Sequence, residues 1–478
     1  MPQVPLEFSD APEASSPAPA APPAARAAQT SDVTPAHAPD SQDSHEPADD
    51  ARVVHDSVTP ETDTPETDSP EADASDPSDG EPVDIPVLDR PADGVPAVIE
   101  DERALVAAAD ALSAGTGPVA VDAERASGYR YGQRAYLVQL RREGSGTFLI
   151  DPIAVPDLEP ISQALEGVEW ILHAATQDLP CLAEVGLRPS RLFDTELGAR
   201  LAGRPRVGLS AVLEHYLTIR LAKEHSAVDW STRPLPEPWL RYAALDVELL
   251  ADLRDALEAD LTSQGKLTWA REEFDHLLDF TGPAPRVDPW RRTSGLHKVR
   301  GRRSAAVVRE LWYARDAIAR SRDLSPGRVL PDAGLLDIAR AAPATPADLA
   351  AACRHKGARR HEREWLAAVG RGLDVPDAQL PPATLPSDAP PPIRAWADRD
   401  PAAAARYAQV REAMLAYAQT REVPVENLLS PDTLRRVMWT PPADGDIAAD
   451  LTRRGARPWQ IGIAAPLVEQ ALVDHPSS

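Results

Sequence analysis

The segment VAVDAE, residues 119–124, constrains the fold of this chain more than any other feature. Its apolar residues predict a buried strand, and the alternation of strand side chains places Asp122 and Glu124 on one face. Two carboxylates at the end of a buried strand repel each other and lose solvation. A divalent cation between them would remove that cost, so the segment predicts a metal site at the end of a strand.

Two further acids and a tyrosine complete the candidate site. Asp178 follows EWILHA, an apolar segment that predicts a buried strand. Asp246 lies in an apolar stretch of a predicted helix, and Tyr242 stands four residues earlier on the same helix face. Each has a simpler explanation by itself, because an Asp at a helix start is often an N-cap and a Tyr–Asp pair often only packs. Their combination favours metal chemistry.

The periodicity of apolar residues predicts a mixed α/β domain over residues 97–284. Strands are predicted at 119–124, 135–142, 146–151 and 169–174. Helices are predicted at 101–114, 157–166, 178–185, 194–201, 209–217, 238–261 and 267–280.

An acidic, proline-rich segment precedes this domain. Residues 1–100 contain 3 Lys or Arg against 23 Asp or Glu, so most of the net charge of −25 lies there. Such a composition cannot bury enough apolar surface to fold, so residues 1–96 are predicted to be a disordered tail. The tail is either a solvated segment without a partner or a mimic of nucleic acid. Because the remainder is close to neutral, the overall acidity does not exclude a nucleic-acid partner.

The chain beyond this domain is basic at first and then helical. Residues 285–303 form a linker, and its stretch 288–303 holds six Lys or Arg, a density that suits either phosphate contacts or a solvated connection. Residues 310–340 and 409–439 align without gaps, which predicts two helical modules of one design. The expected division is a first helical domain at 304–375, a Pro-rich linker at 376–395 and a second helical domain at 396–470.

The sequence also excludes several classes of protein. Its two cysteines, Cys181 and Cys353, lie far apart, which excludes a disulfide framework or a CxxC zinc site and predicts a cytoplasmic location. No apolar run reaches the roughly 18 residues of a membrane span, and no signal peptide or small-molecule cofactor is expected. The oligomeric state is left open.

The motifs VDAE, HAATQD and YAALD resemble, in this order, the signature of the DEDD superfamily of 3′–5′ exonucleases, in its tyrosine branch. The phrases FDTELGARLAG and DWSTRPLPEPWLRYAALDVELL are similar to the ribonuclease D family. RDAIARSRDLSPGRVLPD resembles the helicase-and-RNase-D C-terminal (HRDC) domain, and TREVPVENLLSPD matches it more loosely. The resemblance covers about residues 98–465 and implies a ribonuclease H-like mixed sheet with helices, followed by two HRDC-like all-α domains.

The resemblance implies a metal-dependent 3′–5′ exoribonuclease. Asp122, Glu124, Asp178 and Asp246 would bind two Mg²⁺ or Mn²⁺ ions about 4 Å apart, and Tyr242 would orient the attacking water. Substrates would be the 3′ ends of tRNA precursors and other structured RNAs, and products would be nucleoside 5′-monophosphates. The residues expected to contact RNA are Lys223, His225, Arg291, Arg292, Lys298, Arg300, Arg302 and Arg303.

Other residues near the motifs have structural explanations. His173 is expected in the core or in support of the site, and Asp194 is expected to cap a helix. Asp229 and Trp230 are expected to be structural, whereas Arg233 fits either role.

Two other functions fit the same motifs. A 3′–5′ DNA exonuclease of a repair or proofreading type would use the same acids. A nucleic-acid-binding protein without catalysis would retain the fold, although the presence of all four acids and the tyrosine disfavours it.

Overall fold

The structure is a computed structural model that describes residues 85–222, 228–385 and 387–476. Regular structure begins earlier than the sequence predicts, because β1 (Val87–Leu88) pairs in parallel with β8 (Arg220–Leu221). The last residues of the predicted tail therefore belong to the folded chain, and most of that tail lies outside the described residues.

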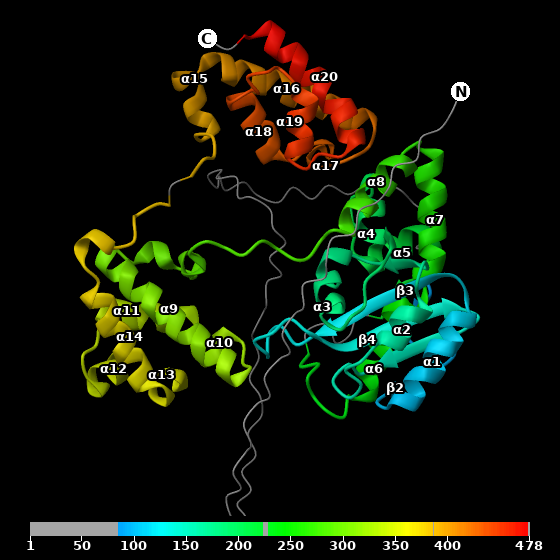
Figure 1. The fold of residues 1–478 in the computed structure, drawn as a ribbon, viewed down its shortest axis with the longest axis horizontal. Helices are drawn as coiled ribbons and strands as arrows, with labels where there is room; N and C mark the ends of the chain where they lie inside the picture. Colours follow the sequence, from blue (N-terminus) through cyan, green and yellow to red (C-terminus); the bar gives the residue numbers. More distant parts are fainter. Residues whose placement is uncertain (1–84, 223–227, 386, 477–478) are drawn as a thin grey trace, which may run out of the picture. The chain divides into compact units, whose positions relative to one another are not determined.

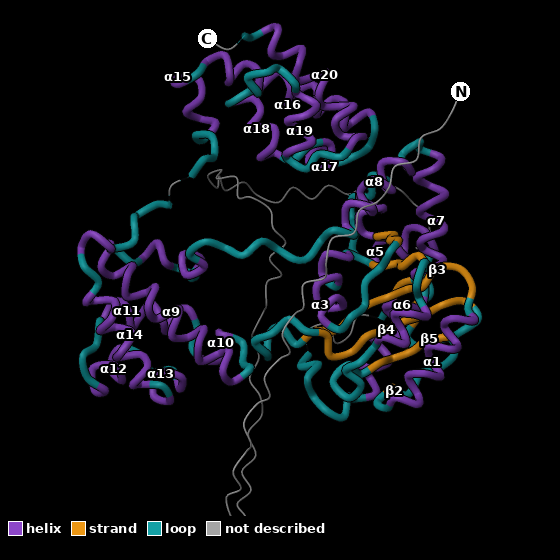
Figure 2. The backbone as a smooth tube through the Cα atoms, in the orientation of Figure 1, coloured by secondary structure: helices purple, strands orange, loops and turns teal. Residues whose placement is uncertain are grey.

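A six-stranded mixed sheet of order β2-β5-β4-β3-β6-β7 organises the first folded region (Figure 1). β3 pairs antiparallel with β4 and parallel with β6, so the strand that carries VAVDAE lies inside the sheet. The strands, orange in Figure 2, are β2 (Val98–Ile99), β3 (Thr116–Arg125), β4 (Ala135–Glu143), β5 (Gly146–Ile150), β6 (Glu169–Leu172) and β7 (Arg191–Asp194).

Helices cover both faces of this sheet. On one face, Val119 and Val121 of β3 belong to a core that also contains Leu105 and Leu112 of α1. On the opposite face, which carries Asp122 and Glu124, α6 packs over the strands. The helices of this region are α1 (Glu102–Ala114), α2 (Glu159–Ala164), α3 (Leu179–Glu184), α4 (Thr195–Leu201), α5 (Leu209–Leu217), α6 (Glu237–Glu248), α7 (Leu250–Ser263) and α8 (Leu267–Leu277).

The prediction of one long helix over 238–261 is wrong. The chain leaves helical geometry at Leu249, where φ is −113° and ψ is 7°, and this residue separates α6 from α7. The break changes the main packing partners, since α6 lies against β3, β4 and β5, whereas α7 lies mainly against α4 and α5 and also touches β3 and β6. A second difference is β7, a four-residue strand that the sequence analysis does not predict.

The chain beyond α8 contains two helical modules, and the predicted repeat is confirmed in their elements. α10 and α11 begin at Pro326 and Asp332, and α17 and α18 begin at Val425 and Pro431, so both pairs are 99 residues apart. The first module contains α9 (Arg302–Arg322), α10 (Pro326–Val329), α11 (Asp332–Ala341), α12 (Pro346–Ala352), α13 (Lys356–Arg360) and α14 (Glu362–Asp374). The second contains α15 (Trp396–Arg399), α16 (Pro401–Thr420), α17 (Val425–Leu428), α18 (Pro431–Trp439), α19 (Ile447–Arg453) and α20 (Pro458–Asp474).

Within the described ranges, no helix combines the length and the apolar character that a membrane crossing requires.

Candidate active site

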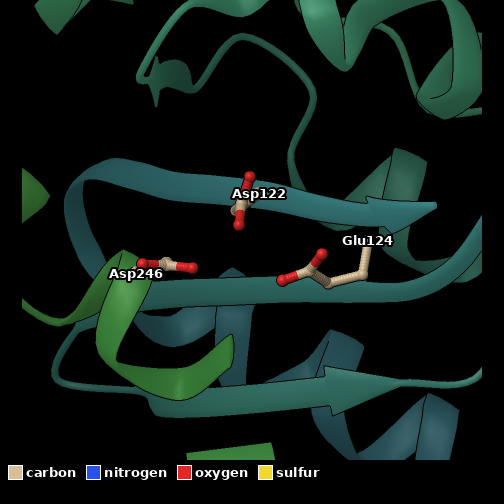
Figure 3. A group of neighbouring side chains, drawn as sticks. All are labelled: Asp122, Glu124 and Asp246. Carbon is tan, nitrogen blue, oxygen red and sulfur yellow. The ribbon is translucent and has the colours of Figure 1, made fainter. Parts of the chain in front are cut away.

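Three of the four predicted acids meet between β3 and α6. Figure 3 shows Asp122 and Glu124 on the strand and Asp246 on the helix, with their carboxylates gathered in one place. One oxygen from each carboxylate lies within 4.8 Å of the other two. All three side chains are partly buried and supply only hard oxygen ligands, a donor set that suits Mg²⁺ or Mn²⁺ and not a thiolate-type zinc site. This arrangement fits a divalent cation.

The electrostatics of the cluster favour a cation as well. Burial raises the pKa of Asp122 to about 6. Burial, together with the charges of Asp122, Asp246 and Asp178, holds the pKa of Glu124 well above its usual range. Burial and the charge of Asp122 also raise the pKa of Asp246 well above its ordinary value. Ionising these carboxylates together is therefore costly unless positive charge is bound among them.

The fourth acid, Asp178, lies beside this group and not within it. It occupies the residue before α3, yet its side chain makes no capping hydrogen bond, so the simple N-cap explanation fails. Burial and the nearby charge of Asp122 raise its pKa well above the usual range. Its Oδ1 lies 4.0 Å from Nε of Arg125, a half-buried residue at the end of β3 that the sequence analysis does not single out. Asp178 is therefore a buried acid that does not cap its helix and whose ion-pair partner is Arg125.

Tyr242 stands next to Asp246, as the helical spacing predicts. Its hydroxyl forms a hydrogen bond with the Asp246 carboxylate. Burial, with the charges of Asp246, Glu124 and Asp122, raises its pKa above the ordinary value of a phenol. The hydroxyl is therefore protonated at neutral pH, so it can donate a hydrogen bond but is unsuited to accept a proton.

A strained turn leads from β6 to Asp178. Ala174 adopts a left-handed conformation, with φ at 63°, that is unfavourable for a residue with a side chain. The buried carboxylate of Asp194 holds this turn, because it accepts hydrogen bonds from the backbone N–H groups of Ala174 and Ala175 at 3.1 and 2.9 Å. The same carboxylate caps α4 through Glu196 and Leu197, which confirms its predicted capping role.

His173 has a supporting position, as predicted. Its Nδ1 lies 2.9 Å from Oγ1 of Thr195, whose hydroxyl donates to the carbonyl oxygen of Leu172. The Thr195 oxygen therefore accepts from Nδ1–H. Burial lowers the pKa of His173 to about 4, so the ring is neutral at physiological pH.

The loop before α6 is held by an ion pair between the buried carboxylate of Asp151 and the more exposed guanidinium group of Arg233. Arg233 donates to both carboxylate oxygens of Asp151 at 2.6 and 2.9 Å and to the carbonyl oxygen of Tyr136 at 2.7 Å. Trp230 is fully buried, and Asp229 accepts hydrogen bonds within the loop, so their predicted structural roles are confirmed. Arg233 also has a structural role here.

Removing one partner of this pair is expected to destabilise the protein. Burial alone would raise the pKa of Asp151, but hydrogen bonds from Arg233 and the Ile153 N–H outweigh it and lower the pKa. An acid with a lowered folded pKa adds stability above its unfolded pKa, and loses that contribution as the pH falls through the folded value. Asp151→Asn should therefore cost about 2 kcal/mol at pH 7 in urea unfolding, and less once the pH falls below the folded pKa of Asp151. An equal cost at both pH values would contradict this account.

The residues predicted to contact RNA divide into three groups: those outside the described residues, those exposed without an ion pair to a described residue, and those already hydrogen-bonded in the structure. Lys223 and His225 lie outside the described residues. Arg292, Lys298 and Arg300 are exposed and form no ion pair within the described part of the chain. These three remain candidates for phosphate contacts.

The other three predicted RNA contacts in the linker are engaged in the structure. Arg291 and Arg302 donate to main-chain carbonyl oxygens in the 380–383 segment, the closest at 2.9 and 2.6 Å. Arg303 donates to two carbonyl oxygens near the end of α14 and pairs with Asp377. These three guanidinium groups anchor the Pro-rich segment by hydrogen bonds, and RNA phosphates would have to compete with those hydrogen bonds.

A second basic surface was missed by the sequence analysis. It consists of five exposed side chains around α13, none of which forms an ion pair with any described residue. We call it the α13 patch; its members are Arg354, Lys356, Arg359, Arg360 and Arg363. The local density of positive charge is visible in the sequence, but the absence of acidic partners is visible only in the fold.

Family models match three parts of the chain. A model described as a 3′–5′ exonuclease matches residues 96–262, and a model of the HRDC domain matches residues 304–369. A model described as a 3′ to 5′ exonuclease C-terminal domain matches residues 389–472.

Individual relatives agree with these matches. The chain is 33% identical to ribonuclease D of Jannaschia sp. over 57% of its own length and 74% of that protein, and 32% identical to ribonuclease D of Acidiphilium cryptum over 62% and 77%. A crystal structure of a protein from Bifidobacterium adolescentis superposes with a TM-score of 0.74 at 38% identity, covering 81% of this chain and 99% of that one. Escherichia coli RNase D, described as an exoribonuclease involved in structured RNA processing, gives 0.59 at 25% identity, covering 80% and 99%.

Proposed function

Because the chain belongs to the ribonuclease D family of 3′–5′ exoribonucleases, we propose that it shortens RNA from the 3′ end by metal-dependent hydrolysis at the β3–α6 site. The observation that carries this proposal is the meeting of Asp122, Glu124 and Asp246, which converge from two separate elements. Three partly buried carboxylates that lie this close together are difficult to explain without a bound cation.

Each residue of the site has a distinct part. Asp122, Glu124 and Asp246 would hold divalent cations, with Asp178 completing the ligand set. Such cations, Mg²⁺ or Mn²⁺ and two in number, supply an activated water and neutralise charge on the phosphate and the leaving oxygen. The protonated hydroxyl of Tyr242, already bonded to Asp246, orients the attacking water. The products would be nucleoside 5′-monophosphates.

The proposed substrates are the 3′ ends of tRNA precursors and other structured RNAs. Support comes from E. coli RNase D, whose description names structured RNA processing, and from the HRDC match of the first helical module. The exposed Lys and Arg side chains of the linker and of the α13 patch that form no ion pair with a described residue offer phosphate contacts outside the active site. The two buried, unpaired cysteines suit the reducing environment of the cytoplasm.

A degradation time course tests the function. The substrates are 5′-labelled single-stranded RNA and DNA of one sequence, each with Mg²⁺, with Mn²⁺ and with EDTA. Stepwise shortening of RNA that EDTA abolishes is the expected result. Faster shortening of DNA would favour a repair-type exonuclease, and no shortening of either strand would leave only a binding function.

Neutralising the α13 patch is expected to weaken RNA binding without changing the chemistry. Arg359→Gln with Arg360→Gln should reduce the affinity for a long RNA several-fold at about 0.1 M salt, and should lower the slope of log K against log salt by about 1.4. The measurement is a salt titration by fluorescence anisotropy. The matched control is Arg340→Gln with Arg371→Gln, because those guanidinium groups are paired with Asp337 and Glu310. Equal effects of the two double variants would exclude a specific role for the patch.

A further inference from the structure

One buried side chain beside the acid cluster has no hydrogen-bonding partner. Gln139, on β4, is fully buried, and both its amide nitrogen and its amide oxygen lack a partner among the described residues. Within those residues it is the only side chain with two such atoms. Burying an unpaired amide opposes folding, because its hydrogen bonds to water are lost and not replaced.

The register of the sheet places this amide at the candidate metal site. Gln139 is paired across the strands with Asp122 on one side and with Leu149 on the other. Directly paired residues of antiparallel strands point to the same face, with Cβ atoms roughly 5 Å apart. Leu149 belongs to the same buried cluster as Ala243 and Ala244 of α6, and α6 packs on β4 and β5, so Gln139 lies beneath the helix that carries Asp246.

A second buried glutamine shows how this side chain is normally accommodated. Gln460 is almost as deeply buried, but its Nε2 donates to the carbonyl oxygen of Asn427 at 2.7 Å. Its Oε1 accepts from the N–H of Arg457 at 3.0 Å. Gln139 is as buried as Gln460 but has no such partners among the described residues, and the residue directly paired with it on β3 is the acid Asp122.

We propose that Gln139 is a positioning residue for the metal site: its amide N–H donates to the carboxylate of Asp122 and holds that carboxylate in the orientation that binds a cation. The inference rests on the proposed function, since it needs a divalent cation at the site. A carboxylate that binds a cation through one oxygen leaves the other free to accept a hydrogen bond, and an amide is a neutral donor that adds no competing charge. Without metal, the amide of Gln139 has no hydrogen-bonding partner in the described part of the chain and costs stability. The folded protein tolerates this cost because the amide gains a partner when the metal binds.

The test separates stability without metal from the response to metal. Gln139→Met replaces the amide by an apolar side chain of similar length, and Gln139→Leu is a second variant of different shape. Thermal unfolding in EDTA should show Tm values raised by a few degrees, because an unpaired buried amide has been removed. The dissociation constant for Mn²⁺, measured by calorimetry, should rise about tenfold.

Gln460→Met is the matched control, and it should lower the Tm and leave Mn²⁺ binding unchanged. A lowered Tm for both Gln139 variants in EDTA, or unchanged Mn²⁺ binding, would overturn the inference while leaving the proposed function intact. A wild-type protein that binds neither Mn²⁺ nor Mg²⁺ would instead overturn the proposed function, and the inference with it.

Discussion

Asp122→Asn should abolish the shortening of RNA while leaving the protein folded. The charge of Asp122 raises the pKa of each of the other three acids, Glu124, Asp178 and Asp246. Asp122 therefore lies at the centre of the site. A bound cation stabilises the negative charge of the transition state by several kcal/mol. Losing one ligand of that cation should therefore reduce the rate of cleavage about 1,000-fold or more. The measurement is single-turnover cleavage of a 5′-labelled RNA with Mg²⁺ and with Mn²⁺.

The same variant should be more stable than wild type in EDTA. Asn keeps the size of the side chain and removes one charge from a cluster in which carboxylates repel one another. Added Mn²⁺ should raise the Tm of wild type and have much less effect on the variant. Asp260→Asn is a suitable control, because that acid pairs with Tyr216 and Arg204 away from the cluster. Full activity in Asp122→Asn would contradict the assignment of the site.

Tyr242→Phe should separate catalysis from metal binding. The hydroxyl is bonded to Asp246 and is protonated at neutral pH, so its role is to orient water and not to bind the cation. Removing one oriented hydrogen-bonding group typically costs about 10²-fold to 10³-fold in kcat. Mn²⁺ affinity should change by no more than about threefold, because all the carboxylates remain.

The control for this variant is Tyr407→Phe, a tyrosine of α16 in the second helical module. Single-turnover rates at saturating RNA and calorimetry with Mn²⁺ provide the two readouts. A Tyr242→Phe enzyme that loses Mn²⁺ affinity in parallel with its rate would show that the phenol acts on the ligand Asp246 rather than on water.

The sequence predicts the parts of the site that depend on local spacing. Strand alternation puts Asp122 and Glu124 on one face, and helical spacing puts Tyr242 beside Asp246; the structure has both arrangements. Asp178 is predicted by its place after a strand, and its missing cap bond becomes visible only in three dimensions. The repeat of the helical modules is also a local pattern, and the matching bounds of their elements bear it out.

The remaining features depend on contacts between distant segments. Nothing near Leu249 signals a helix break, because leucine is a good helix former and the break serves the different packing of α6 and α7. The hydrogen bonds from Arg302 and Arg303 to carbonyl oxygens join residues 70 or more positions apart. The position of Gln139 opposite Asp122 requires the register of two strands. Sequence patterns identify the chemistry of a residue, but its partners follow from the assembled fold.

The hydrogen bonds of Asp194 have a consequence for genetic screens. This carboxylate holds the turn at Ala174 and the start of α4, and it thereby fixes the approach to Asp178 without belonging to the acid cluster. In a scan that scores only loss of activity, substitutions at Asp194 would be grouped with those at the metal ligands. Measuring the amount of folded protein in the same cells would separate them, because Asp122 variants should accumulate normally and Asp194 variants should be degraded.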